Sequence, residues 1–170
     1  DAFLLDVFMG LPDAPENLED VFTLPNHGLE IAKNISTTEP DLAAVKASRP
    51  DQSDCFLGPN VIELCRLADI TFLGLHGGEG ENGKLQATFD LLGIRYTGPD
   101  SLGCALAMDK GVTKVIFQRC NVSTPGGGWL YKKDLDKPLS EMGLSLPVVV
   151  KPCSGGSSIG VYIVNTEEEY

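Results

Sequence analysis

The fold is decided by a stretch from Leu146 to Val164, which reads LPVVVKPCSGGSSIGVYIV. An apolar, β-branched run ends at Lys151, a loop of glycines and serines follows, and a second β-branched run begins at Val161. The pattern predicts a two-stranded hairpin with a lysine at its mouth. An anion in such a loop would meet backbone amides, serine hydroxyls and the lysine ammonium. A phosphate-binding loop and a glycine-rich hairpin without a ligand both fit these residues.

Three familiar glycine motifs do not fit this loop. Residues 156–160, GSSIG, match the G-x-S-x-G pattern of a hydrolase nucleophile, but strand-like residues follow them and no histidine lies beyond His76. A Walker loop carries its lysine after the glycines, whereas Lys151 precedes them. A dinucleotide fingerprint would need glycine in place of Ser157. What remains is a hairpin that folds over nucleotide phosphates as a flap.

Negative charge is concentrated in the first part of the chain. The 170 residues carry a formal net charge of -11; residues 1–108 hold 17 acidic and 6 basic side chains, and residues 109–170 hold 7 of each. Such a surface repels nucleic acid, which excludes it as a partner. Five scattered cysteines indicate neither a disulfide framework nor a zinc site. With no leader and no apolar run near the roughly 20 residues of a membrane helix, we expect a soluble intracellular protein.

Helical and extended patterns alternate through the middle of the chain, as in a parallel α/β sheet. Helices are expected at 59–68, at 84–92 with a stop at Gly93, at 101–108, and from Asp109 or Thr113 to 119, with a looser one at 134–143. Extended runs are expected at 2–8, 70–75, 94–97, 128–133, 147–151 and 161–164. Ser101 is the expected cap of the third helix, and residues 165–170 have the features of a helix start. Residues 21–60 give no firm assignment, and His27 within them is interpreted as a solvated loop residue.

A second glycine-rich loop, HGGEGENGK, runs from His76 to Lys84. It joins a predicted strand to a predicted helix. In open α/β folds the loops at the carboxyl ends of strands face the ligand crevice. His76 is therefore either a ligand-binding residue or a histidine that is hydrogen-bonded within a tight turn.

Five motifs follow one another in a fixed order. They are HGGEGENGKLQ at 76–86, LGIRYTG at 92–98, ALAMDK at 105–110, TK at 113–114, and VKP at 150–152 with GSSIG at 156–160. In this order and spacing they resemble the D-alanine–D-alanine ligases of the ATP-grasp superfamily. The resemblance covers roughly residues 70–164, and because five motifs agree, it is specific although each alone is weak.

The resemblance implies an α/β fold in two parts. Residues 1–108 would form a Rossmann-like, pre-ATP-grasp substrate domain with a parallel sheet. Residues 109–170 would form the small α+β lobe of an ATP-grasp domain. Both parts are expected to be incomplete, because the family's opening strand and glycine-rich loop would precede Asp1 and the larger half of its ATP-grasp domain would follow Tyr170.

Members of this family use ATP and Mg²⁺ to convert the carboxylate of one D-alanine into an acyl phosphate, which the amine of a second D-alanine attacks. The dipeptide serves peptidoglycan synthesis, and thus cell-wall biogenesis and cell shape. The resemblance implies a cytoplasmic homodimer, assembled through its first domain, with ATP and D-alanine as small-molecule substrates. Two alternatives stay open: a D-alanine–D-lactate or D-alanine–D-serine ligase, and a non-catalytic fragment that only dimerises.

The resemblance also assigns roles to the hairpin loop and to one residue before it. Lys110 and Lys151 would contact the phosphates of ATP as point charges. Gly156, Ser157 and Ser158 would bind the phosphates as well, and the two serines would stabilise the transferring phosphoryl group. A closing lid would protect the acyl phosphate from water.

His76 completes the set of candidate catalytic residues with Ser157 and Ser158, because the resemblance places it near the first D-alanine. The Mg²⁺ ligands and the adenine-binding residues of the family would lie beyond Tyr170. No metal-binding residue is therefore assigned, and the chain alone is expected to be inactive.

Overall fold

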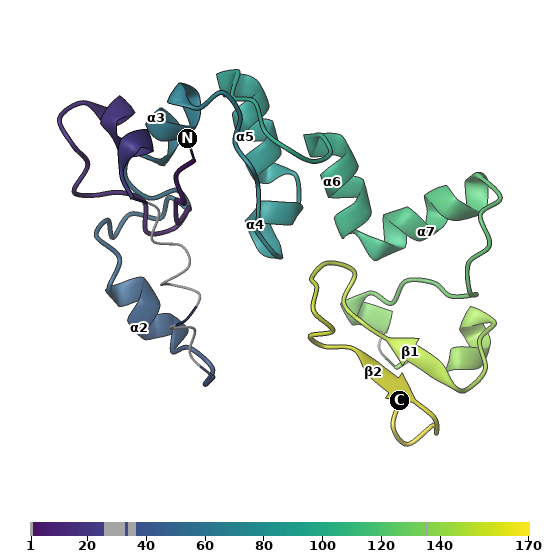
Figure 1. The fold of residues 1–170 in the computed structure, drawn as a ribbon. Coiled ribbons are helices and arrows are strands. Elements are labelled where there is room, and N and C mark those ends of the chain that lie inside the picture. The colour runs from purple at the N-terminus through teal and green to yellow at the C-terminus, as the bar shows by residue number, and fades with distance from the viewer. Residues whose placement is uncertain (1, 26–32, 34–36, 135) are drawn as a thin grey trace. The chain divides into compact units, whose positions relative to one another are not determined.

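The computed structural model describes residues 2–25, 33, 37–134 and 136–170, in two compact units. Unit 1 runs from Asp1 to Thr71 and unit 2 from Phe72 to Tyr170. Helices and turns dominate both units in Figure 1, and the strands found in the described ranges form one hairpin of unit 2. His27 lies outside the described residues. None of the helices within these ranges is long and apolar enough to span a membrane.

Unit 1 is built on the contact between the α3 helix, Val61–Leu67, and the 3-10 helix η1, Leu18–Thr23. Val61 and Leu64 are buried on α3, and Val21 of η1 is 0% exposed. The apolar spacing of residues 61–65 therefore produces a packed helix face, as the sequence predicts. A further short helix, α2, spans Leu42–Ala47.

A buried arginine joins three loop segments of unit 1. Arg49 is 5% exposed, and its guanidinium donates hydrogen bonds to the backbone carbonyl oxygens of Phe8 at 2.9 Å, Ser53 at 3.1 Å and Leu57 at 3.0 Å. The same group lies 4.4 Å from the centre of the Phe8 ring. A guanidinium suits this position because its donors point in several fixed directions within one plane.

Four consecutive helices form the first part of unit 2. They are α4 (Gly78–Glu81), α5 (Lys84–Leu92), α6 (Ser101–Met108) and α7 (Lys110–Arg119). Each contacts the next, and Figure 1 shows them in teal and green. Leu85, Phe89, Ile94 and Cys104 are buried between them, and the Phe89 ring meets the Tyr96 ring edge-on at 5.9 Å.

The ends of these helices follow ordinary capping chemistry. Gly93 ends α5 in the left-handed region at φ 68°, which confirms the predicted glycine stop. Asp109 caps α7, so of the two expected starts, Asp109 and Thr113, the first is observed. The prediction that Ser101 caps α6 is wrong: Ser101 is the first helical residue, and the carboxylate of Asp100 accepts the N–H of Gly103 at 2.7 Å. A carboxylate there also complements the partial positive charge of the helix start.

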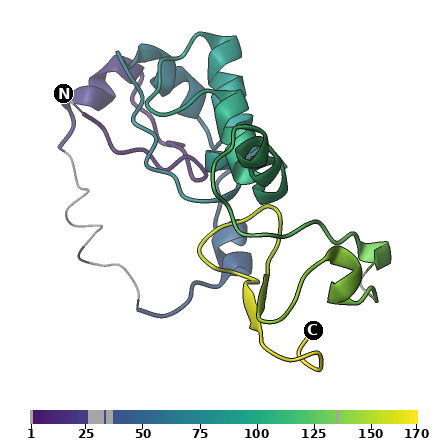
Figure 2. The same ribbon diagram turned by 90° about the vertical axis from the view of Figure 1, so that its right-hand side faces the viewer.

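The predicted hairpin is confirmed. Strand β1, Val148–Val150, pairs antiparallel with β2, Tyr162–Val164, so that Val149 lies opposite Ile163. Leu146 and Pro147 are joined by a cis peptide bond. Figure 2 shows the loop between the two strands in yellow, and this loop is hydrogen-bonded to the first residue of α7.

The parallel sheet expected of residues 1–108 does not appear among the described residues. The runs 2–8, 70–75, 94–97 and 128–133 form no strand there, although side chains 71–75 alternate between half-buried and exposed. A strand needs a ladder of backbone partners, whereas the N–H of Leu73 donates to the side-chain hydroxyl of Thr97 at 3.1 Å. β-Branched composition predicts an extended backbone but does not supply its partner. The observed class is mixed helix with a small antiparallel sheet.

Two other segments that were expected to be helical form 3-10 or other turns. The 134–143 segment contributes only to the 3-10 turns η2, Lys132–Asp134, and η3, Leu139–Met142. At 165–170 the expected cap bonds form around a turn instead of a helix. The hydroxyl of Thr166 accepts the N–H of Glu169 at 3.3 Å, and the Glu169 carboxylate accepts the N–H of Asn165 at 2.7 Å.

Replacing Arg49 with methionine is expected to destabilise unit 1. The change leaves three part-buried backbone carbonyl oxygens without their donor. An unsatisfied buried acceptor costs about 1–3 kcal/mol, so three at the low end of this range give an expected loss of roughly 3–4 kcal/mol. Urea unfolding followed by circular dichroism measures it. Arg66→Met, at an exposed arginine of α3, is the matched control. A loss below about 0.5 kcal/mol for Arg49→Met, the level of an ordinary surface change, would contradict the role given to Arg49.

Candidate functional site

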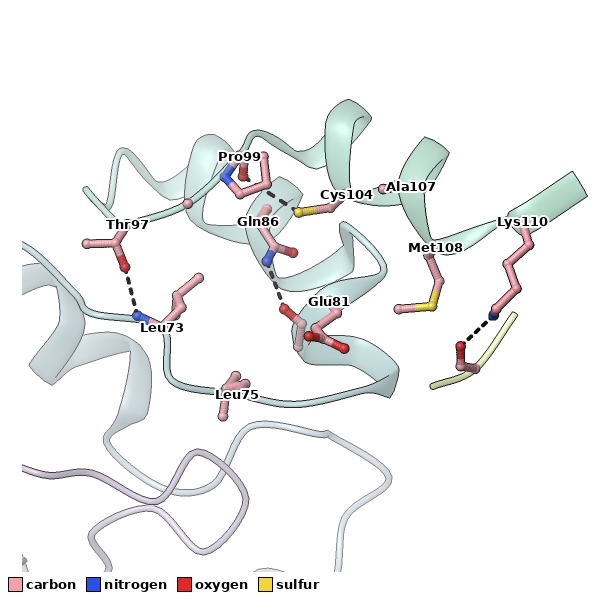
Figure 3. A pocket seen from close by; sticks show the side chains of 13 residues that line it. Leu73, Leu75, Glu81, Gln86, Thr97, Pro99, Cys104, Ala107, Met108 and Lys110 are labelled. Atoms are coloured by element: carbon pink, nitrogen blue, oxygen red, sulfur yellow. Dashed lines mark hydrogen bonds between the residues drawn. The ribbon is translucent and has the colours of Figure 1, made fainter. Parts of the chain in front are cut away.

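The candidate site is a pocket of about 440 Å³ in unit 2 (Figure 3). Its walls come from the 76–86, 92–98 and 105–110 motifs and from the hairpin loop. The lining residues are Leu73, Leu75, Gly80, Glu81, Gln86, Thr97, Gly98, Pro99, Cys104, Ala107, Met108, Lys110 and Gly155. Motifs that are far apart in the sequence therefore meet around one cavity, which is mostly apolar and has one carboxylate and one ammonium in its wall.

Lys110 connects the helices of unit 2 to the hairpin loop. Its backbone N–H donates to the carbonyl oxygen of Cys153 at 2.9 Å. Its ammonium donates to the carbonyl oxygens of Gly155 at 2.7 Å and Cys153 at 3.4 Å. Asp109 fixes this end of α7, because its carboxylate accepts the N–H groups of Gly111 at 2.9 Å and of the next residue at 3.0 Å. The predicted phosphate ligand thus lies against the predicted phosphate loop.

The tip of the loop has an unusual backbone. Ser157 and Ser158 have φ values of 53° and 60°, in the left-handed region that favours glycine, and Gly155 and Gly160 have φ values of 116° and 71°. Both serines are exposed. Non-glycine residues in this region cost about 1 kcal/mol or more each, and such strain is found most often at functional sites.

The remaining predicted residues lie outside the pocket wall. Lys151 follows β1 directly and is exposed, as are Gly156, Ser157 and Ser158. His76 is exposed too, and within the described part of the chain its imidazole makes no hydrogen bond. The structure brings Lys110 to the loop that carries the serines, but it does not bring His76 or Lys151 into the cavity.

The His76 loop is shaped by the one-turn helix α4, which the sequence did not reveal. The carboxylate of Glu81 accepts the N–H of Gly77 at 2.6 Å. The side-chain amide of Gln86, on α5, donates to the carbonyl oxygen of Gly80 at 2.8 Å. Figure 3 shows Gln86 and Glu81 on neighbouring parts of the pocket wall. Four glycines in nine residues predicted a loop here, and only the tertiary contacts select this turn.

Sequence reasoning assigned no role to Glu81 or Gln86, although both lie in a quoted motif. The available signal was the position of Gln86, a polar residue between Leu85 and Phe89 on the buried side of α5. A buried polar side chain normally has a specific hydrogen bond, and here that bond goes to α4.

Cys104 is the one cysteine in the pocket wall, among the residues that the structure describes. Burial raises the pKa of its thiol, and the nearby carboxylates of Asp100 and Glu81 raise this pKa further. The thiol is therefore neutral at pH 7 and is a poor nucleophile.

Two family models match the chain in succession. The first is described as D-ala D-ala ligase N-terminus and matches residues 19–99, and the second as D-ala D-ala ligase C-terminus and matches residues 127–170. Similar curated proteins are the D-alanine–D-alanine ligases of Lacticaseibacillus casei, 40% identical over 170 residues, and Pediococcus pentosaceus, 42% identical over 173 residues. Each alignment covers 99% of this chain but 46% and 47% of the relative, so the chain spans just under half of their length.

Solved structures of D-alanine ligases also match the chain. The D-alanine–D-alanine ligase of Helicobacter pylori matches with a TM-score of 0.56 and 32% identity over 59% of this chain and 30% of that chain. The D-alanine–D-alanine ligase of Bacillus anthracis in complex with ATP matches with a TM-score of 0.54 and 37% identity, over 65% of this chain and 35% of that chain. The VanG D-Ala:D-Ser ligase of Enterococcus faecalis matches with a TM-score of 0.55 and 34% identity, over 60% of this chain and 30% of that chain.

Gly80→Ala is expected to displace α4. A Cβ atom at residue 80 would lie 2.6 Å from the Cβ atom of Leu75, closer than two such carbons can approach. We expect the variant to lose about 1–3 kcal/mol in the free energy of unfolding. Urea unfolding tests this against Gly74→Ala, where the nearest atom to an added Cβ is a Phe72 ring carbon at 3.5 Å. Equal stabilities of the two variants would show that α4 is not packed as described.

Lys110→Met is expected to loosen the hairpin loop. The variant keeps an apolar stem but loses the ammonium bonds to Gly155 and Cys153. We expect amide hydrogen exchange in residues 153–160 to quicken about tenfold, in line with the loss of a hydrogen bond from a charged donor. Lys114→Met is the control, because the Lys114 ammonium donates to Gly126 instead, at 3.3 Å. Unchanged exchange in Lys110→Met would remove this lysine as the tether of the loop.

Proposed function

Because the chain belongs to the D-alanine–D-alanine ligase family, we propose that it supplies part of an ATP-dependent enzyme that joins two D-alanines. The observation that carries the proposal is the ordered match of both family models, supported by 40% identity over 99% of the chain. The pocket in unit 2, which residues of the quoted motifs line, also supports it. The proposed product is D-alanyl-D-alanine for peptidoglycan, made in the cytoplasm.

The proposed reaction has two steps. A carboxylate oxygen of the first D-alanine attacks the γ-phosphorus of ATP, which gives an acyl phosphate and ADP. The amine of the second D-alanine then attacks the acyl carbon, forms the peptide bond and expels inorganic phosphate, with loss of a proton. Because water would hydrolyse the acyl phosphate, a closing loop would improve the yield.

Within this scheme we assign phosphate contacts to Lys110 and Lys151. The support for Lys110 is its bond to the hairpin loop, which puts a positive charge beside the Gly155 backbone. Lys151 stands exposed at the end of β1, where a ligand can reach it. Gly156, Ser157 and Ser158 would offer amide and hydroxyl donors to the phosphoryl group.

For His76 we propose a place near the first D-alanine, as the family resemblance implies. The exposed imidazole has no competing partner among the described residues, so it is available to a ligand. It would contribute by orienting the substrate. The residues that the structure describes contain no group of three or more His, Cys, Asp or Glu that could hold a metal ion.

Two further features belong to the same proposal. The boundary between a substrate domain, 1–108, and the small ATP-grasp lobe, 109–170, falls in the interval 100–126 that the two family models leave between them. Assembly as a homodimer through the first domain is expected from the family resemblance, and sedimentation of the chain with and without ATP would test it separately from nucleotide binding.

A D-alanine–D-serine ligase is the second candidate. The observation in its favour is the structural match to the VanG D-Ala:D-Ser ligase, at 34% identity. Product analysis with D-alanine alone, and with an equimolar mixture of D-alanine and D-serine, separates the two activities. Exclusive formation of the mixed dipeptide would favour the second candidate.

Lys151→Ala is expected to weaken ATP use in a complete ligase that carries this segment. One such protein is the Lacticaseibacillus casei enzyme with its matching region replaced by residues 1–170. Loss of a hydrogen bond to a charged group costs about 1.5–3 kcal/mol, which corresponds to an increase of about 10–100-fold in the KM for ATP. Phosphate release measures it, with Lys132→Ala at another exposed lysine as control. A KM within twofold of the parent would end the phosphate role of Lys151.

A further inference from the structure

Both neighbours of His76 are fixed to one residue, Gly80. Leu75, which precedes His76, packs closely on Gly80: a Cβ atom added to Gly80 would lie 2.6 Å from the Cβ atom of Leu75. Gly77, which follows His76, accepts the N–H of Gly80 at 3.2 Å through its carbonyl oxygen. The position of the His76 backbone therefore depends on where Gly80 is held.

Gly80 is held by Gln86. Gln86 is 4% exposed on α5, and its Nε2 donates to the carbonyl oxygen of Gly80 at 2.8 Å. The flanking residue Leu85 is also buried, so the side chain projects from a packed part of the helix. A bond from such a position leaves α4 little freedom to rotate or slide along α5.

The state of the Gln86 amide oxygen indicates that the hydrogen bond to Gly80 is the reason why a glutamine stands at this position. The Oε1 atom is buried and has no hydrogen-bond partner among the described residues, which disfavours the folded state. Exchanging the oxygen and nitrogen of the amide would face two oxygens against each other at Gly80. An apolar residue such as leucine or methionine would avoid the buried oxygen but could not hold Gly80.

We propose that Gln86 is a positioning residue for His76. The inference rests on the proposed function, in which His76 lies near the first D-alanine. Gln86 touches no substrate in this assignment. It fixes Gly80, Gly80 fixes Leu75 and Gly77, and these two residues fix the backbone from which the imidazole projects.

The test uses the 170-residue chain labelled with ¹³C and ¹⁵N, and the variants Gln86→Met and Gln86→Glu. Methionine keeps the length of the side chain without a donor, and glutamate at pH 7.5 presents oxygens to Gly80. We expect both variants to shift the imidazole resonances of His76 and the amide resonances of Gly77 and Gly80. Gln118→Met, at an exposed glutamine of α7, is the matched control and should leave these signals unchanged.

Titration with D-alanine links the shift to the proposed site. We expect the His76 resonances of the wild type to respond to D-alanine, and the apparent Kd to rise at least fivefold in Gln86→Met while the signals of Phe89 stay in place. If the wild type does not respond, the proposed role of His76 fails, whereas the positioning role is still judged from the resonances without ligand. The positioning role would be overturned if, in both variants, the His76 resonances kept their wild-type positions and the Kd for D-alanine stayed within twofold of the wild-type value.

A measurement on the wild type decides the matter if the variants do not fold. The side-chain amide protons of Gln86 should exchange slowly with solvent and show a nuclear Overhauser contact to the Hα protons of Gly80. Fast exchange and absence of this contact would contradict the bond on which the inference depends.

Discussion

The hydrogen bonds of Lys110 are the constraint on which the site in unit 2 depends. In the described part of the chain, all the hydrogen bonds between helices α4–α7 and residues 151–160 come from this one lysine. Its backbone bond sets where the loop meets α7, and its ammonium bonds set how the loop turns at Gly155. Since Asp109 caps the same helix end, the loop is anchored to a rigid point of the fold.

The conformations of the two glycine-rich loops of unit 2 are fixed in the same way. Glycines give each loop many accessible conformations, and one long polar side chain from a helix selects among them. Lys110 does this for the hairpin loop through Gly155, and Gln86 does it for the His76 loop through Gly80. The catalytic candidates His76, Ser157 and Ser158 need no bonds of their own to be placed, so their polar groups remain available to a ligand.

Local chemistry explains what the sequence predicted correctly. The stop of α5 at Gly93, the cap of α7 at Asp109 and the hairpin around residues 151–160 are all set by residues close together in the chain. The expected parallel strands are not found among the described residues, because pairing depends on a distant partner that composition does not encode. The partners of Lys110 and Gln86 were likewise invisible, since they lie 45 and 6 residues away and are backbone carbonyls.

The engagement of Lys110 has a consequence for the proposed nucleotide site. One ammonium has three donors, and here it makes two hydrogen bonds to neutral carbonyl oxygens of the loop. A phosphate oxygen carries negative charge and is the stronger acceptor, so a bound nucleotide would draw Lys110 away from Gly155. The loop would then lose its ammonium bonds and keep the backbone bond from Lys110 to Cys153, while the phosphates offer new acceptors to its own amides and serine hydroxyls. The left-handed backbone of Ser157 and Ser158 costs energy in the tethered loop, so rearrangement of the loop around a bound phosphate would release part of that cost.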